Sequence, residues 1–198
     1  MVCTTIEYIE NWLRANLTKE RFEHSLGTAE CARWLAEKFG VDSEKAYFAG
    51  LIHDCAKCLP KEETLSIING CVDLDEGELE NPKTHHAPAG VYVAEKEFGV
   101  EDKEVLDSIR CHTVGKEDMT TFEKIIFLAD KIEERTRPKE LIEPIKAVLD
   151  EDCGLDKALF LCYKNTINSL TDRNLKICTK TIDIYNRLCN DLDLNGKR

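Results

Sequence analysis

The sequence predicts an all-α fold, a bundle of helices without a sheet. Apolar residues recur at helical spacing through most of the 198 residues, and proline and glycine are sparse, with 5 and 10 copies. Residues that favour strands do not cluster in alternating runs. The length suits one domain, which we expect to span residues 1–198.

Helices in the first third of the chain are expected where apolar stripes lie between capping signals. Residues 4–17 carry one such stripe. The next helix begins after Thr18, a favourable N-cap residue, and ends at Gly40, a common position for a left-handed residue. Asp42 or Ser43 can cap a third helix, which runs to the pair His53–Asp54.

Loop signals separate the remaining helices. Pro60 opens a short helix to about residue 69, and residues 70–83 are expected to form a loop because they hold two glycines and a proline. A helix over 86–98 ends at Gly99. Further helices are expected over 102–112, 120–134, 138–149, 155–171 and 176–190. We expect a functional core of about residues 18–135, with a C-terminal helical extension of about 138–190 packed on it.

Composition excludes several classes of partner. The formal net charge of −11 argues against binding to a nucleic acid polymer, which usually needs a basic surface. It permits a small anionic ligand, because a metal and a few local cations reverse the potential inside one cleft. No apolar run is long enough to span a bilayer, and the N-terminus does not resemble a signal peptide.

The chain has ten cysteines, and we expect a reducing, cytoplasmic location in which most of them are small apolar core residues. Cys55 and Cys58 form a single CxxC motif. No second CxxC pairs with it and no βαβ pattern surrounds it, so a structural role is favoured over a redox or zinc-binding role.

The pair His53–Asp54 is the first indication of a functional site. An apolar helical segment leads directly into an imidazole and a carboxylate, and burying either group unpaired is costly. A divalent metal removes that cost for both. Ions such as iron, manganese, cobalt or zinc suit mixed nitrogen and oxygen ligands. The alternative is a core histidine bonded to the neighbouring carboxylate.

Two other segments strengthen the metal interpretation. His24 lies near the start of an earlier helix, and Asp130 follows the apolar run Ile125–Leu128. The order of His, then His-Asp, then Asp across several helices resembles the HD phosphohydrolase superfamily, over at least residues 21–135. The resemblance implies that His24, His53, Asp54 and Asp130 bind the metal.

Four short motifs extend the resemblance to a narrower family. They are Asp54-Cys-Ala-Lys57, His86-Ala-Pro-Ala-Gly90, Ile109-Arg-Cys-His-Thr-Val-Gly115 and Leu128-Ala-Asp-Lys-Ile-Glu133. In this order they resemble the symmetrical bis(5′-nucleosyl)-tetraphosphatases. That family implies a helical, usually dimeric enzyme that cuts diadenosine tetraphosphate into two ADP molecules. It also implies iron as the favoured metal, with manganese, cobalt or zinc as alternatives and one or two ions.

His86 and His112 have two interpretations. They bind a second metal bridged by Asp54, or they contact phosphate and protonate the leaving ADP. The second is favoured, because a second site would offer only two histidines and one shared carboxylate. Lys57, one turn after Asp54, is expected to neutralise phosphate.

Several further residues are candidates for substrate binding. Arg21 lies one turn before His24, and Thr113 adds a hydroxyl beside His112. The family usually has Pro-x-Arg after the last motif, whereas this chain has Arg135 and Arg137 there, and the sequence does not choose between them. The break between the last two helices contributes two more candidates, Arg173 and Lys176.

Two other functions fit the same residues. Another HD enzyme, such as a 5′-nucleotidase or a cyclic-nucleotide phosphodiesterase, would share the metal ligands and differ in pocket shape. A non-catalytic regulator would bind metal and nucleotide without turnover, although such a protein would not need His86, His112 and Lys57 together.

Overall fold

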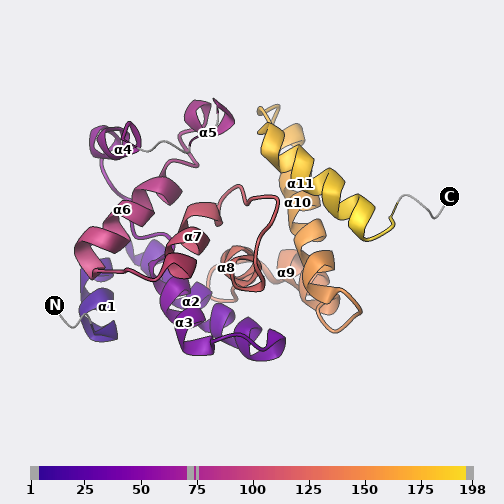
Figure 1. Ribbon diagram of the computed structural model, residues 1–198, viewed down its shortest axis with the longest axis horizontal. Coiled ribbons are helices and arrows are strands. Elements are labelled where there is room, and N and C mark those ends of the chain that lie inside the picture. The colour runs from indigo at the N-terminus through magenta and orange to yellow at the C-terminus, as the bar shows by residue number, and fades with distance from the viewer. Residues whose placement is uncertain (1–4, 71–73, 75, 195–198) are drawn as a thin grey trace.

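The computed structural model describes residues 5–70, 74 and 76–194, and within them it contains eleven helices and no strand (Figure 1). The expected all-α fold is confirmed. The helices are α1 (Ile6–Asn16), α2 (Lys19–Phe39), α3 (Ser43–Ile52), α4 (Lys61–Ile68), α5 (Glu76–Glu80), α6 (His86–Phe98), α7 (Lys103–Cys111), α8 (Thr121–Ile132), α9 (Lys139–Ala147), α10 (Gly154–Asp172) and α11 (Thr179–Asp191).

The helix ends follow the capping signals of the sequence. The Thr18 side chain accepts a hydrogen bond from the backbone N–H of Arg21, and Asp42, rather than Ser43, caps α3. Gly40 ends α2 with a φ of 73°, a left-handed conformation that glycine adopts without steric cost. Local sequence therefore determines where these helices begin and end.

One expected loop contains a helix. Residues 70–83 include α5, which the two glycines and the proline of this segment did not suggest. Its Glu78 side chain is buried and accepts hydrogen bonds from both terminal nitrogens of Arg110, at 2.7 and 2.9 Å. A tertiary partner 32 positions away thus stabilises a helix that local propensity does not predict. Residues 71–73 and 75 of this loop lie outside the described part.

The core is built around α2, which packs against α3 and α8 (Figure 1). Small residues allow α2 and α3 to approach closely. A Cβ atom placed on Gly50 would lie 2.9 Å from the Cα atom of Ala29 and from the carbonyl oxygen of Thr28, which is too near. Because Gly50 lies one turn before His53, this close approach also sets how far His53 stands from α2.

The C-terminal helices pack on α8, as expected. α9 and α10 both contact α8, and α11 pairs with α10. Phe127 of α8 stacks on Tyr163 of α10, with ring centroids 5.1 Å apart. The Tyr163 hydroxyl donates to the carbonyl of Val114 at 2.8 Å, so α10 also holds the segment that follows α7.

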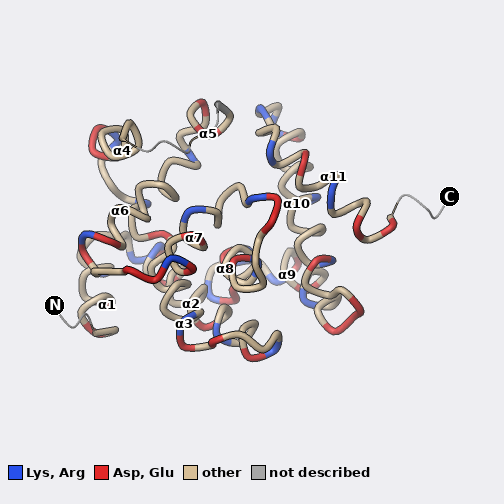
Figure 2. The backbone as a smooth tube through the Cα atoms, in the orientation of Figure 1, with Lys and Arg blue, Asp and Glu red and all other residues tan. Residues whose placement is uncertain are grey.

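Charged residues of both signs are distributed over most helices (Figure 2). The first nine of the thirteen residues of α6, His86 to Ala94, include no Lys, Arg, Asp or Glu, and most of this segment is buried. Along the described chain, none of the helices combines the length and the apolar character that crossing a membrane requires.

The two cysteines of the CxxC motif differ in burial, and the buried one favours a structural role. Cys55 is buried, and its thiol donates to the carbonyl of Gly90 at 3.6 Å, whereas Cys58 is exposed. Both thiols are free. Burial raises the pKa of the Cys55 thiol, so it stays protonated and unreactive.

Candidate metal centre

Five helices bring ionisable side chains to one buried position. α2 provides His24, the end of α3 provides His53 and Asp54, and the last turn of α8 provides Asp130. His112 directly follows α7, and His86 is the first residue of α6. All six side chains are buried, with relative exposures between 0% for His53 and 7% for Asp130.

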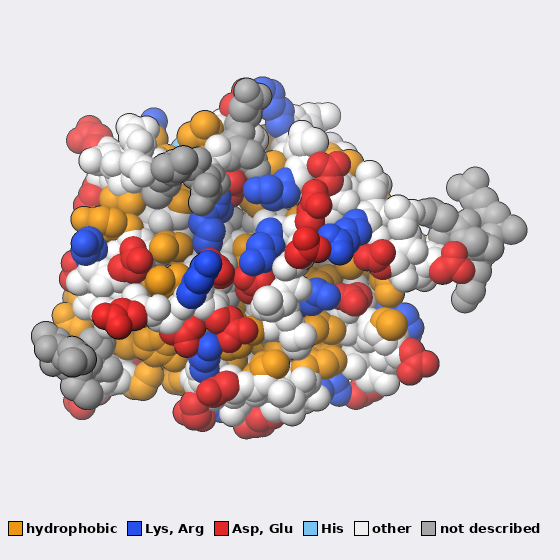
Figure 3. All heavy atoms as spheres, in the orientation of Figure 1, with side chains coloured by type: hydrophobic (Ala, Val, Ile, Leu, Met, Phe, Trp, Pro, Cys, Tyr) orange, Lys and Arg blue, Asp and Glu red, His pale blue; other side chains and the backbone are white. Residues whose placement is uncertain are grey.

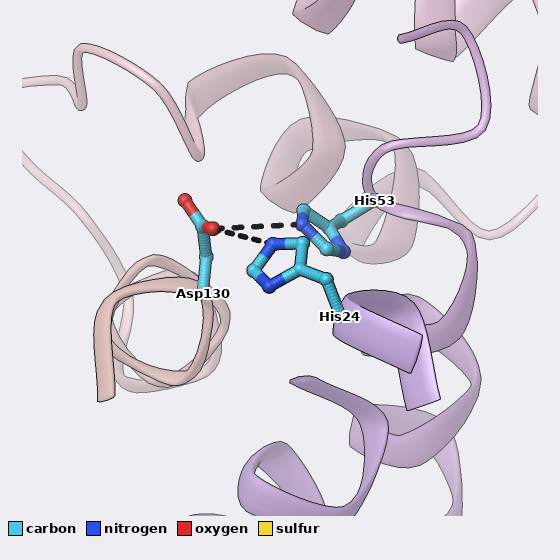
Figure 4. Close-up of side chains that lie close together, drawn as sticks. All are labelled: His24, His53 and Asp130. Carbon is cyan, nitrogen blue, oxygen red and sulfur yellow. Dashed lines mark ion pairs between the residues drawn. The ribbon is translucent and has the colours of Figure 1, made fainter. Parts of the chain in front are cut away.

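His24, His53 and Asp130 form the first part of the cluster. Both imidazole rings point toward the Asp130 carboxylate, which faces them from α8 (Figure 4). The Oδ1 atom of Asp130 lies 2.9 Å from Nε2 of His24 and 3.8 Å from Nε2 of His53. The three ligand atoms lie within 4.8 Å of one another, as one bound cation requires.

Asp54 joins a second, overlapping group. Its carboxylate lies 4.0 Å from Nε2 of His53 and 3.4 Å from Nε2 of His112, and these three residues satisfy the same distance criterion. Nε2 of His86 lies 3.0 Å from Asp54 and 3.0 Å from Nε2 of His112. Among the described residues, His86 belongs to neither group of three.

Backbone and carboxylate acceptors orient three of the imidazoles in the same way. Nδ1 of His53 donates to the carbonyl of Gly50 at 2.7 Å, and Nδ1 of His112 donates to the carbonyl of Ile109 at 2.7 Å. Nδ1 of His24 donates to the Glu133 carboxylate at 3.1 Å. Each ring therefore presents the lone pair of Nε2 to the centre of the cluster.

The donor set fits a divalent cation. Nε2 of His24, Nε2 of His53 and Oδ1 of Asp54 are buried atoms without a hydrogen-bond partner. Unpartnered buried polar atoms are costly, and three that converge are best explained by an ion that they share. Mixed imidazole and carboxylate ligands suit borderline metals such as iron, manganese, cobalt and zinc.

Electrostatics keeps Asp54, His112 and His86 in the forms that bind cations, whereas hydrogen bonds to Asp130 and Glu133 outweigh burial and raise the pKa of His24. Burial raises the pKa of the Asp54 carboxyl, but His53, His112 and His86 outweigh burial and hold that pKa well below its usual range. Burial lowers the pKa of His112 to about 4, and it lowers the pKa of His86 as well. At neutral pH the carboxylate is therefore ionised, and these two imidazoles are neutral.

Four cationic side chains surround the two carboxylates, and we call them the cationic collar. Arg21 and Lys57 approach Asp54 at 3.5 and 3.6 Å. Lys131 pairs with Asp130, and Arg137 approaches Asp130 Oδ1 at 2.9 Å. The collar residues are partly exposed, so positive charge reaches the surface beside the cluster in a chain whose net charge is −11.

The structure separates the two arginine candidates. Arg137 lies at the cluster, where it also donates to the backbone carbonyl of Asp130 at 2.8 Å. Arg135 points away and pairs with Glu23 and Glu30 on the surface, at 2.7 and 2.6 Å. Of the two arginines, Arg137 therefore lies at the metal cluster and Arg135 does not.

Of the other substrate-binding candidates, one lies beside the metal cluster and two lie away from it. Thr113 lies beside His112, and its hydroxyl oxygen is buried without a hydrogen-bond partner. Arg173 and Lys176 do not reach the cluster but line a separate cavity beside α5.

Sequence reasoning overlooked two residues of the site. Glu133 is fully buried against His24, and Lys131 lies between Asp130 and the carbonyl of His112, 3.5 Å from the latter. Both belong to the same motif as Asp130. Glu133 follows Asp130 by one helical turn, a spacing that could have indicated its position.

Comparison with known proteins decides the family. The HD domain family matches residues 21–135, which contain every residue of the cluster and the first three cations of the collar. The chain belongs to the HD domain family. The resemblance of the histidine and aspartate motifs to this superfamily is thereby confirmed.

Similarity to individual HD proteins extends over nearly the full length. The symmetrical bis(5′-nucleosyl)-tetraphosphatase of Bacillus subtilis is 38% identical, over 89% of this chain and 93% of its own length. The protein of the same name from Staphylococcus aureus is 33% identical, over 91% and 93%. The narrower resemblance read from the four motifs is thus confirmed beyond the HD domain itself.

A solved structure shows the same fold. It is a predicted HD superfamily hydrolase involved in NAD metabolism from Clostridium acetobutylicum, with a TM-score of 0.87 and 37% identity. The match covers 94% of this chain and 98% of the other. It therefore includes the C-terminal helices as well as the helices that form the cluster.

Proposed function

We propose that this HD protein hydrolyses diadenosine tetraphosphate symmetrically to two ADP molecules, with a divalent metal held by His24, His53, Asp54 and Asp130. The observation that carries the proposal is the convergence of unpartnered, buried ligand atoms inside the cationic collar. Full-length similarity to the symmetrical tetraphosphatases of B. subtilis and S. aureus supports this substrate.

When bound, the metal lowers the pKa of a coordinated water, so that hydroxide is available near neutral pH, and it neutralises charge on phosphate oxygens. The chain's own contribution is to hold the ligands in place. The Nδ1 hydrogen bonds of His24, His53 and His112 prevent the rings from rotating, so no reorganisation is needed when substrate arrives.

The cationic collar is suited to a polyphosphate. Arg137 offers a planar, bidentate donor, and Lys57 and Lys131 offer compact charges. In the described structure these groups pair with Asp54 and Asp130. We propose that phosphate oxygens share them when substrate binds, and that Arg21 reaches a phosphate at the outer edge. Thr113 would add a hydroxyl contact.

His86 and Lys57 lie side by side at the metal cluster. Nζ of Lys57 lies 2.9 Å from Nε2 of His86, and burial lowers the pKa of both groups. A lysine or histidine of lowered pKa gives up a proton more readily. We propose that this pair donates a proton to the ADP that departs, and that His112 contacts phosphate beside it.

The experiment that tests the proposal is product analysis. The metal-loaded protein is incubated with diadenosine tetraphosphate, and the nucleotides are separated by anion-exchange chromatography. ADP as the sole product is expected. AMP with ATP would mean asymmetric cleavage. Turnover of a nucleoside monophosphate or a cyclic nucleotide instead would assign another HD activity, and binding without product would assign a regulator.

Four finer properties belong to the same proposal. We propose iron as the metal, one homodimer as the assembly, residues 1–198 as one HD domain, and the cytoplasm as the location. Metal analysis of protein purified without added metal tests the first. Light scattering tests the second, limited proteolysis the third and cell fractionation the fourth.

A further inference from the structure

A cavity of about 450 Å³ lies between α5, the segment that leads to His86, and the turn that joins α10 to α11. Figure 2 shows basic positions on that turn, close to α5. The volume falls within the range of small-molecule sites, about 300–1,000 Å³. The cavity is separate from the residues of the metal cluster.

The lining combines apolar and cationic groups. Leu170, Leu175 and Ile177 provide apolar surface, and Lys83, Arg173 and Lys176 provide positive charge. The carboxylate of Glu80 also lines the cavity and pairs with Lys176 at 2.8 Å. Apolar walls suit the faces of a base, and cations suit a phosphate attached to a ribose.

One wall of the cavity continues into α6. Asn81 lines the cavity, and its carbonyl accepts hydrogen bonds from the backbone N–H and the hydroxyl of Thr84, at 3.0 and 2.8 Å. The next residue, His85, donates to the carbonyl of Glu78 at 3.0 Å. His86 of the metal cluster follows directly, so this wall and the cluster belong to one hydrogen-bonded segment.

The buried Glu78 carboxylate connects the cavity to the metal cluster by a second route. It pairs with Arg110 of α7, which stands two positions before His112, and with Lys180 of α11 at 3.5 Å. α5, α7 and α11 are thus held together by one carboxylate. Figure 3 shows Lys and Arg side chains gathered in the central part of this face, over the region of α7 and the loop that follows it.

We propose that the cavity is a nucleoside subsite. It takes the base and ribose of one nucleoside diphosphate half of the substrate, while the phosphates of that half extend along Lys83 and α6 to the cationic collar. The assignment rests on the proposed function and deepens it. In this proposal Arg173 and Lys176, which lie away from the metal cluster, help to bind the nucleoside of that half of the substrate.

Two variants test the subsite by different means. Thr179→Trp fills the cavity from an exposed position in its lining, and Arg173→Ala removes a cation. Lys164→Trp and Lys164→Ala, at an exposed position of α10 outside the lining, are the matched controls. Calorimetry on the metal-loaded protein measures the affinity for ADP and, separately, for inorganic tripolyphosphate.

We expect both variants to weaken ADP binding about tenfold or more, as loss of a charge-assisted contact or of space would do. Thr179→Trp should leave tripolyphosphate affinity unchanged, and the Lys164 variants should leave both affinities unchanged. Unchanged ADP affinity in both cavity variants would overturn the subsite. Equal losses of ADP and tripolyphosphate affinity in Thr179→Trp would also overturn it, because they would place the effect at the metal cluster.

Hydrolysis measured in parallel separates this proposal from the proposed function. A wild-type protein that does not cut diadenosine tetraphosphate, but loses ADP affinity in the variants, would refute the function and keep the subsite. A wild-type protein that cuts it, with an unchanged KM in both variants, would keep the function and refute the subsite.

Discussion

Glu133 accepts a hydrogen bond from Nδ1 of His24 at 3.1 Å, and its side chain is fully buried. The same carboxylate accepts the backbone N–H groups of Arg135 and Thr136, at 2.7 and 3.0 Å. Gly27 makes room for it, since a Cβ atom there would lie 2.3 Å from Glu133 Oε2. One side chain thus orients a candidate metal ligand and shapes the turn that returns Arg137 to Asp130.

Glu133→Ala should weaken metal binding by about 10- to 100-fold, the usual effect of removing the partner of a ligating histidine. His24 would then be free to rotate, and the turn after α8 would lose its acceptor. Competition with a chelator gives the metal affinity. Glu134→Ala is the matched control, because that neighbouring side chain is exposed and pairs with Lys146. Wild-type affinity in Glu133→Ala would show that the hydrogen bond does not position His24.

Asp54→Ala should abolish turnover and remove most of the bound metal. Asp54 is nearly fully buried and its carboxylate contacts His53, His86 and His112, so its loss removes a charged ligand from the second part of the cluster. Metal content by elemental analysis and product formation by chromatography are the two measurements. Asp54→Asn keeps the shape of the side chain and controls for misfolding. Activity retained in both variants would refute the metal assignment.

His112→Ala distinguishes one bound ion from two. If His112 contacts phosphate, turnover should fall by about 10²- to 10⁴-fold, the range for a lost acid–base or polar contact, while metal content stays constant. His112 also satisfies the distance criterion with His53 and Asp54. A loss of half of the metal would therefore establish a dinuclear centre. The measurement is metal content per chain alongside kcat.

Arg137→Ala should raise KM for the tetraphosphate more than tenfold, because a bidentate, charge-assisted phosphate contact is lost. Arg135→Ala should leave KM unchanged and reduce stability little, because its pairs with Glu23 and Glu30 are exposed to solvent. Steady-state kinetics compares the two variants, and thermal unfolding checks that both fold. A larger KM effect from Arg135→Ala would reverse the assignment.

Much of the fold follows from local sequence. Helical spacing and caps predict α2 and α3 to within a residue or two, because Thr18, Gly40 and Asp42 act through the adjacent backbone. α5 does not follow from local sequence. Its Glu78 is stabilised by Arg110, and the contribution of such a distant pair is invisible in a short stretch of sequence.

The sequence by itself determined the helical class, the family and the identity of the clustered residues. Apolar residues at helical spacing predict the helices, and the order of His24, His53–Asp54 and Asp130 along the sequence indicates the family. It also placed Lys57 one helical turn after Asp54, and the two side chains approach to 3.6 Å. Arg21, one turn before His24 in the sequence, approaches Asp54 at 3.5 Å, a contact that the spacing did not predict.

Only the tertiary structure decided which side chains meet across helices. It selected Arg137 over Arg135, joined Glu133 to His24, and placed Arg173 and Lys176 beside a cavity instead of the metal cluster. The physical reason is that side-chain direction depends on how packed helices rotate and approach. The close contact at Gly50 is one example, and it arises only when the whole chain has folded.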